Sequence, residues 1–125
     1  ISPECRFDAA GYNLITLGDG VTISYGTSIL VHDYSIDKAL FSRRGEHGKF
    51  LKPVSIGRNC FIGANSMILP GTTIGNDCII GGGSIVKGDF PDGSIICGNP
   101  ARIVGDIDEF LARHEQKEDI VYERS

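Results

Sequence analysis

The chain of 125 residues is long enough for one domain, and 41% hydrophobic with 22% charged residues is the composition of a folded protein. A formal net charge of −4 argues against non-specific nucleic-acid binding. No apolar run approaches the ~18 residues of a membrane span, the first residues lack the apolar segment of a signal peptide, and the four cysteines form no metal-ligand pattern. We therefore expect a cytoplasmic protein with no membrane span and no nucleic-acid partner.

A six-residue repeat runs through most of the chain. It opens at Leu17, Ile23 and Ile29, breaks off, and from residue 56 reads IGRNCF, IGANSM, ILPGTT, IGNDCI, IGGGSI, VKGDFP. A period of six residues fits neither the 3.6-residue period of a helix nor the two-residue period of a strand. It fits a short strand plus a turn, three of which close a triangular coil of eighteen residues. The opening residues of adjacent coils should then stack in pairs: Ile56 on Ile74, Ile62 on Ile80, and Ile68 on Val86.

Two further positions of the repeat support such a coil. Two places before each opening residue stands a small or β-branched residue that suits a narrow interior: Ile15, Val21, Thr27, Val54, Cys60, Ser66, Thr72, Cys78 and Ser84. Three places after it stand mostly residues that tolerate the left-handed backbone of a tight corner: Gly20, Gly26, His32, Asn59, Asn65, Gly71, Asp77, Gly83 and Asp89. Cys60 and Cys78 would be neighbours within disulfide range, but we favour two free buried thiols.

The repeat is interrupted between about residues 33 and 53 and fades after Pro91. A loop that long inside a compact repeat is usually functional or disordered, and this one is rich in basic residues. Pro100 marks the departure from the last coil. Asp106 with Glu109 forms a capping pair, which predicts a short helix and tail over residues 106–125 after a repeat domain of residues 1–105.

The segment from Lys52 to Arg102 resembles the hexapeptide-repeat acyltransferases, in particular the sugar O-acetyltransferases that modify galactosides, maltose, lipopolysaccharide or capsule. Its closing run Gly98-Asn99-Pro100-Ala101 is highly typical of them. The resemblance covers about residues 12–105. It implies an all-β fold, a left-handed parallel β-helix, with the interruption as a long loop and a short C-terminal helix. It also implies a homotrimer with active sites between subunits, acetyl-CoA as co-substrate and no metal.

His32 is the predicted catalytic residue. It is the one histidine among the corner positions, and it stands immediately before the interruption. In the family that this chain resembles, a histidine here, often followed by Asp and an aromatic residue or His, takes the proton of the acceptor hydroxyl. This chain has His32-Asp33-Tyr34, and imidazole titrates near neutral pH, as a general base requires. The alternative is a histidine that merely occupies a corner.

The resemblance also implies which residues meet the two substrates. For acetyl-CoA they are Phe61, Ala64, Gly82, Lys87 and Arg102; Gly88 stands where a lysine is common, and Lys87 would substitute for it. For the acceptor they are Asp33 and Tyr34. The basic residues Arg43 and Arg44 are also acceptor candidates: with Lys49 and Lys52 they could meet an anionic sugar, but they could equally meet the phosphates of coenzyme A or form a solvated basic loop. His47 is interpreted as a solvated loop histidine and His114 as structural or exposed.

The activity implied is direct transfer of an acetyl group from acetyl-CoA to a hydroxyl of a sugar or cell-surface polysaccharide precursor. An N-acetyltransferase acting on an amino-sugar, or a serine acetyltransferase, would share the fold and the co-substrate. A metalloenzyme of the γ-carbonic anhydrase type needs three converging histidines, two of them closely spaced, which His32, His47 and His114 are not. A non-catalytic assembly module is disfavoured by the long interruption beside His32.

Overall fold

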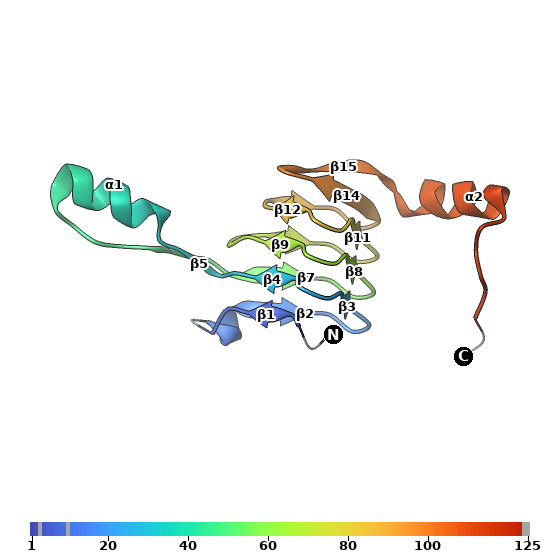
Figure 1. Ribbon diagram of the computed structural model, residues 1–125, viewed down its shortest axis with the longest axis horizontal. Helices are drawn as coiled ribbons and strands as arrows, with labels where there is room; N and C mark the ends of the chain where they lie inside the picture. The colour runs from blue at the N-terminus through green and yellow to red at the C-terminus, as the bar shows by residue number, and fades with distance from the viewer. Residues whose placement is uncertain (3, 10, 124–125) are drawn as a thin grey trace.

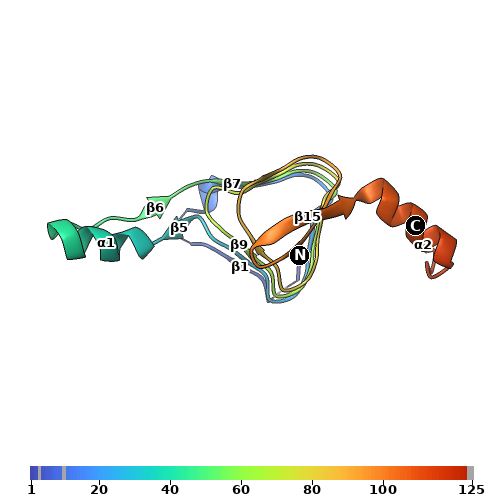
Figure 2. The ribbon, with the colours of Figure 1, turned by 90° about the horizontal axis from the view of Figure 1, so that it is seen from above.

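The computed structural model describes residues 1–2, 4–9 and 11–123. Its centre is a column of stacked coils. The short strands of the coils run parallel within each of three sheets, and the three sheets make the column three-sided when it is seen from above (Figures 1 and 2). Two helices project from the column on opposite sides (Figure 2). In the described part of the chain, no helix is long and apolar enough to cross a membrane.

Each coil contributes one strand to each sheet. The first sheet has the order β1 (Arg6–Phe7), β4 (Ser28–Ile29), β9 (Met67–Ile68) and β12 (Ile85–Val86). The second has the order β13 (Asp89–Phe90), β10 (Thr73–Ile74), β7 (Val54–Ile56) and β2 (Ile15–Leu17), the last preceded by a 3-10 turn at Tyr12–Leu14. The third has the order β15 (Ala101–Asp106), β14 (Ser94–Gly98), β11 (Ile79–Ile80), β8 (Phe61–Ile62) and β3 (Thr22–Ile23).

The predicted stacking of the opening residues is confirmed. Ile56 pairs with Ile74, Ile62 with Ile80, and Ile68 with Val86. The first coil joins the same ladders across the interruption: Leu17 pairs with Ile56, Ile23 with Ile62, and Ile29 with Ile68. Nearly all of these side chains are fully buried, so they form the hydrophobic core that holds the coils together.

The positions two before each ladder residue also face the interior. All are buried except Ile15 and Val21, which lie in the first coil and are partly exposed. Cys60 and Cys78 are free, and their thiols donate to the carbonyl oxygens of Gly75 (3.1 Å) and Pro91 (3.2 Å). Burial raises the pKa of the Cys60 thiol. The expectation of two free buried thiols is therefore confirmed.

The left-handed backbone predicted for the corners is present at all but two of the positions named. The backbone is left-handed at Gly20, Gly26, Asn59, Asn65, Gly71, Asp77 and Gly83. The prediction was wrong for Asp89, which lies in β13, because Gly88 takes the positive φ one residue earlier (123°). It was also wrong for His32, because the chain leaves the coil there as β5 (His32–Asp33), which pairs antiparallel with β6 (Phe50–Leu51).

The interruption is an ordered arm, where a loop was predicted. Strands β5 and β6 form its base and carry α1 (Ser35–Arg44), which extends away from the column (Figure 1). The sequence has end signals for this helix: Asp37 in the first turn, arginines in the last, and Gly45 in left-handed conformation after it. No residue of α1 is buried, so the hydrophobic periodicity that identifies most helices was missing.

The C-terminal helix is confirmed as α2 (Ile107–Lys117). Asp106 is its N-cap, and its carboxylate accepts a hydrogen bond from the backbone N–H of Glu109 at 2.9 Å. Before it, the chain does not simply leave the coil at Pro100. Strand β15 turns back and pairs antiparallel with β14, so the third sheet gains an extra strand at the C-terminal end of the column.

Candidate active site

His32 forms a close pair with the carboxylate of Asp8, which directly follows β1 and precedes the first coil. Its Nδ1 lies 2.5 Å from Oδ2 of Asp8, and the same oxygen accepts the backbone N–H groups of Val31 (3.0 Å) and His32 (3.2 Å). The Asp8 side chain is 4% exposed, whereas that of His32 is 30% exposed. A buried carboxylate that accepts several hydrogen bonds holds the ring in a defined orientation.

The pairing of Nδ1 with Asp8 determines what the other ring nitrogen can do. A neutral imidazole carries one N–H, and a carboxylate acceptor places that hydrogen on Nδ1. Nε2 then keeps its lone pair and can accept a proton from a hydroxyl group. This is the arrangement of a histidine general base with a carboxylate partner.

Asp33, although it adjoins His32 in sequence, has a different role. Its carboxylate accepts the backbone N–H and the hydroxyl of Ser35, both at 2.9 Å, at the start of α1. These two hydrogen bonds lower the pKa of Asp33. Asp33 therefore anchors the helical arm, while the next residue, Tyr34, contacts the His32 ring edge-on at 5.5 Å between centroids.

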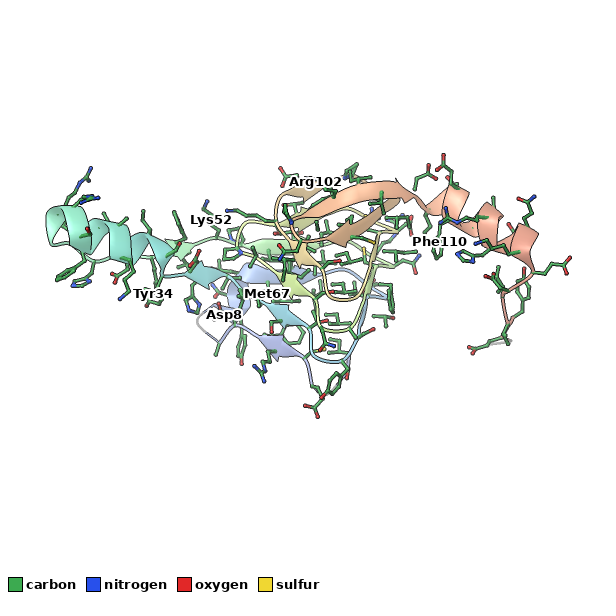
Figure 3. All side chains as sticks on the ribbon, turned by 45° about the horizontal axis from the view of Figure 1, so that its top comes forward. Asp8, Tyr34, Lys52, Met67, Arg102 and Phe110 are labelled. Carbon is green, nitrogen blue, oxygen red and sulfur yellow. The ribbon has the colours of Figure 1, made fainter. Side chains whose placement is uncertain are left out.

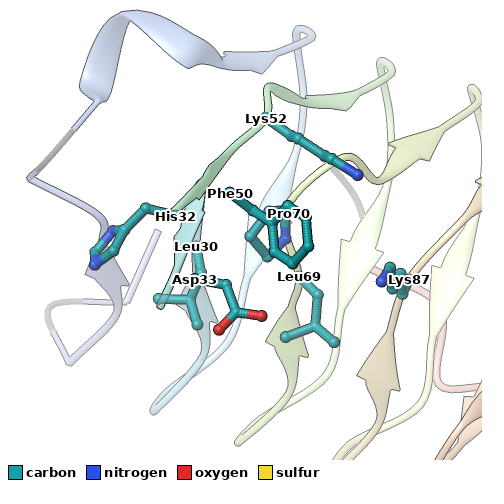
Figure 4. A pocket seen from close by; sticks show the side chains of 8 residues that line it. All are labelled: Leu30, His32, Asp33, Phe50, Lys52, Leu69, Pro70 and Lys87. Carbon is teal, nitrogen blue, oxygen red and sulfur yellow. The ribbon is translucent and has the colours of Figure 1, made fainter. Parts of the chain in front are cut away.

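A pocket of about 220 Å³ lies beside this pair, at the edge where the arm leaves the column (Figure 4). Three coils and both strands of the arm contribute to it. It is lined by Leu30, His32, Asp33, Phe50, Lys52, Leu69, Pro70 and Lys87. The apolar members form much of the wall, and the charged members are Asp33, Lys52 and Lys87 (Figure 4).

The residues expected at the coenzyme lie in three places. Lys87 lines the pocket of His32, but the others do not. Phe61 lies in β8 with 43% of its surface exposed, and Ala64 and Gly82 follow β8 and β11 at another edge of the column. There the Ala64 carbonyl accepts the N–H of Gly83 at 2.8 Å. Arg102 is exposed on β15, at the C-terminal end (Figure 3).

The remaining candidates lie away from the pocket. Arg43 and Arg44 are at the far end of α1, and neither lines the pocket. His47 bonds to Asp37 (3.0 Å) and stacks on Phe41 within the arm. His114 of α2 bonds to Asp119, a contact outside the column. Among the described residues, no group of three or more His, Cys, Asp or Glu side chains could hold a metal ion.

Asp8 is a candidate functional residue that the sequence did not reveal. It precedes the first recognisable repeat block, and it is separated from His32 by 24 positions. No spacing rule connects the two, because Asp8 directly follows β1, outside the repeat, and meets the start of the arm only in the folded chain (Figure 3). The available signal was weak: an isolated acidic residue just before the repeat.

Comparison with known proteins agrees with this architecture. The family model of the hexapeptide repeat of succinyl-transferase matches residues 53–87. CapG of Staphylococcus aureus is 40% identical over 117 residues, which cover 88% of this chain and 67% of CapG. The chain spans about half the length of other curated relatives that it matches, for instance 52% and 48% of two of them.

Solved structures show the same fold. The crystal structure of a maltose O-acetyltransferase from Clostridium difficile 630 has a TM-score of 0.69 and 30% identity, over 84% of this chain and 64% of that one. A galactoside acetyltransferase in complex with coenzyme A has a TM-score of 0.73 over 100% of this chain and 66% of that one. At 24% identity, the second likeness concerns the fold alone. The repeat, the stacked parallel coils and the match to CapG show that this chain belongs to the hexapeptide-repeat acyltransferase family.

Proposed function

We propose that the protein transfers an acetyl group from acetyl-CoA to a hydroxyl of a sugar or cell-surface polysaccharide precursor, with His32 as general base. The observation that carries the proposal is the 2.5 Å pair of His32 Nδ1 and Asp8 at the wall of a pocket. The similarity to a maltose O-acetyltransferase supports the class of reaction. Asp8 acts through His32 and is a positioning residue.

The proposed reaction uses Nε2 of His32, the ring nitrogen that does not face Asp8. As the acceptor oxygen attacks the thioester carbonyl carbon, Nε2 takes the hydroxyl proton and the ring becomes positively charged. The Asp8 carboxylate stabilises that charge at hydrogen-bond distance. Collapse of the tetrahedral intermediate breaks the carbon–sulfur bond, and the imidazolium returns its proton to the departing thiolate. Backbone N–H groups of the glycine-rich corners are candidate donors to the oxyanion.

The other edge of the column fits the pantetheine arm of acetyl-CoA. Phe61 offers exposed apolar surface there, and the backbone of adjacent coils is packed so closely that a Cβ on Gly82 would lie 3.2 Å from the Ala64 carbonyl oxygen. Such a surface offers backbone groups to a narrow, extended ligand. Arg102, exposed on β15, is available for the phosphates of the coenzyme.

We further propose that the coils wind left-handed, that the protein works in the cytoplasm, and that it assembles as a homotrimer. Ala64 and Gly82 lie at one edge of the column, and the pocket of His32 lies at another. Both edges border the first sheet, but they lie apart in one chain. In a trimer, the edge of one copy that carries Ala64 and Gly82 can meet the edge of the next copy that carries His32. The active site would then lie between subunits.

The test measures thiol release from acetyl-CoA across a panel of sugars and amino-sugars, with wild type, His32→Ala and His114→Ala. His32→Ala should lower kcat at least ~100-fold without loss of folding, because general base catalysis contributes that much. His114 is the matched control, since it also pairs with an aspartate but lies outside the pocket. Unchanged turnover in His32→Ala would refute the mechanism. Activity that requires added zinc would favour the metalloenzyme alternative.

A further inference from the structure

Two lysines line the pocket of His32, and neither forms an ion pair with a carboxylate of the described residues. Lys52 and Lys87 enter the pocket from different coils (Figure 4). Among the described residues that line the pocket, the only acid is Asp33, whose oxygens accept hydrogen bonds from Ser35. Ion pairs among the described residues join histidines to aspartates and include neither lysine. The pocket therefore has an excess of positive charge in a chain whose net charge is −4.

The side chain of Lys52 is held over the pocket wall. Its Nζ lies 5.1 Å from the centroid of the Phe50 ring, and its aliphatic part passes the corner at Gly71. A cation over an aromatic face keeps its remaining hydrogen-bond donors available. Lys87 lies near the Asp33 carboxylate, whose pKa it helps to lower, after the hydrogen bonds from Ser35. Both ammonium groups thus belong to the lining of the pocket that His32 also lines, and neither forms an ion pair with another described residue.

The location of these donors distinguishes between the two substrates. In acetyl-CoA the whole pantetheine arm separates the phosphates from the thioester, which must lie at His32 for the reaction to occur. An anion bound inside the pocket of His32 therefore belongs to the acceptor. In one chain the pocket has about 220 Å³, less than the 300–1,000 Å³ typical of drug-sized ligands, so the part formed by this chain suits one sugar ring.

Building on the proposed acetyl transfer, we propose that the pocket selects a monosaccharide unit carrying a negative charge, as a carboxylate or a phosphate. Lys52 and Lys87 bind that anion and are specificity-determining residues. Phe50, Leu69 and Pro70 supply an apolar wall for the ring. Lys87, which the family resemblance would assign to the coenzyme, thereby acts on the acceptor side.

The test compares binding of glucose, glucuronate and glucose 6-phosphate by calorimetry, with the wild type and Lys52→Met, Lys87→Met and Lys117→Met variants. Methionine keeps the length of the side chain and removes its charge. Lys117, exposed at the end of α2, is the matched control. At least one anionic sugar should bind wild type about tenfold more tightly than glucose. Each pocket variant should lose most of that preference, and 0.5 M salt should weaken it.

The outcomes separate the possible anions and the two proposals. Whether glucuronate or glucose 6-phosphate binds more tightly shows whether the pocket prefers a carboxylate or a phosphate. Equal binding of all three sugars to wild type would overturn the inference, as would pocket variants that weaken coenzyme A and leave the sugars unaffected. If no acceptor releases thiol from acetyl-CoA while the charge preference persists, the proposed function fails and the anion site stands. If neutral sugars are acetylated as well as anionic ones, only the anion site fails.

Discussion

Replacing Asp8 by asparagine separates the charge of this residue from its shape. Oδ2 of Asp8 accepts two backbone N–H groups as well as His32 Nδ1. An asparagine must therefore place its oxygen at this position, since its NH2 group would face two donors. The tautomer of His32 is then preserved, and the negative charge next to its ring is lost. Asp8→Asn should accordingly be a mild variant.

The size of its effect follows from the two kinds of hydrogen bond. A hydrogen bond to a charged group contributes about 1.5–3 kcal/mol, and a neutral one about 0.5–1.5 kcal/mol. The difference of roughly 1.4 kcal/mol corresponds to about a tenfold lower kcat. KM for the acceptor should change little, because Asp8 does not line the pocket. Asp8→Ala should cost more in both kcat and stability, because it leaves two backbone N–H groups without their acceptor.

The assay is steady-state thiol release with each substrate varied, together with thermal unfolding of every variant. Asp119→Asn is the matched control, since Asp119 pairs with His114 at 2.8 Å outside the column. A folded Asp8→Asn variant with wild-type kcat would refute the electrostatic role of Asp8. A change in KM alone would instead make Asp8 a ligand of the acceptor.

Three further predictions concern the fold and the arm. Ile80→Ala should destabilise the protein by about 2–5 kcal/mol in denaturant unfolding, because Ile80 is completely buried in the middle of a ladder. Asp106→Ala should cost about 1 kcal/mol and speed hydrogen exchange in α2, because the Glu109 N–H loses its cap. The pKa of Asp33 is lower in the folded protein than in the unfolded chain. The ionised Asp33 carboxylate should therefore stabilise the fold fully above the ordinary aspartate pKa, and this stabilisation should be lost as the pH falls through the lower pKa of the folded protein. An NMR titration of the Ser35 amide should follow that loss, and Asp33→Asn should abolish the transition.

The column was predictable because each coil repeats the same local constraints. An isoleucine every six residues and a residue that accepts positive φ three places later determine both the strand and the corner. The register between coils then follows without long-range information, as the pairing of Ile62 with Ile80 confirms. Even the interrupted first coil was assigned correctly, since Ile23 pairs with Ile62 across the inserted arm.

The parts outside the repeat were not predictable in the same way. Helix α1 buries no side chain, so no hydrophobic stripe revealed it. Strand β15 was missed because its residues Arg102 to Val104 are exposed and lack the six-residue pattern. Asp8 was missed because a contact between irregular backbone and a distant side chain has no period. Sequence periodicity thus located His32, but only the structure revealed its partner.

The proposed site forms where the repeat is broken. Up to Leu30, backbone N–H groups of the first coil donate to carbonyl oxygens of the second, as Leu30 does to Ile68. The next two backbone N–H groups, those of Val31 and His32, donate instead to Oδ2 of Asp8. One carboxylate oxygen thus replaces the carbonyl ladder at the point where the chain turns into the arm, and it also pairs with the His32 ring. A carboxylate that accepts backbone hydrogen bonds at this point is fixed in place, so the imidazole keeps an acceptor at Nδ1.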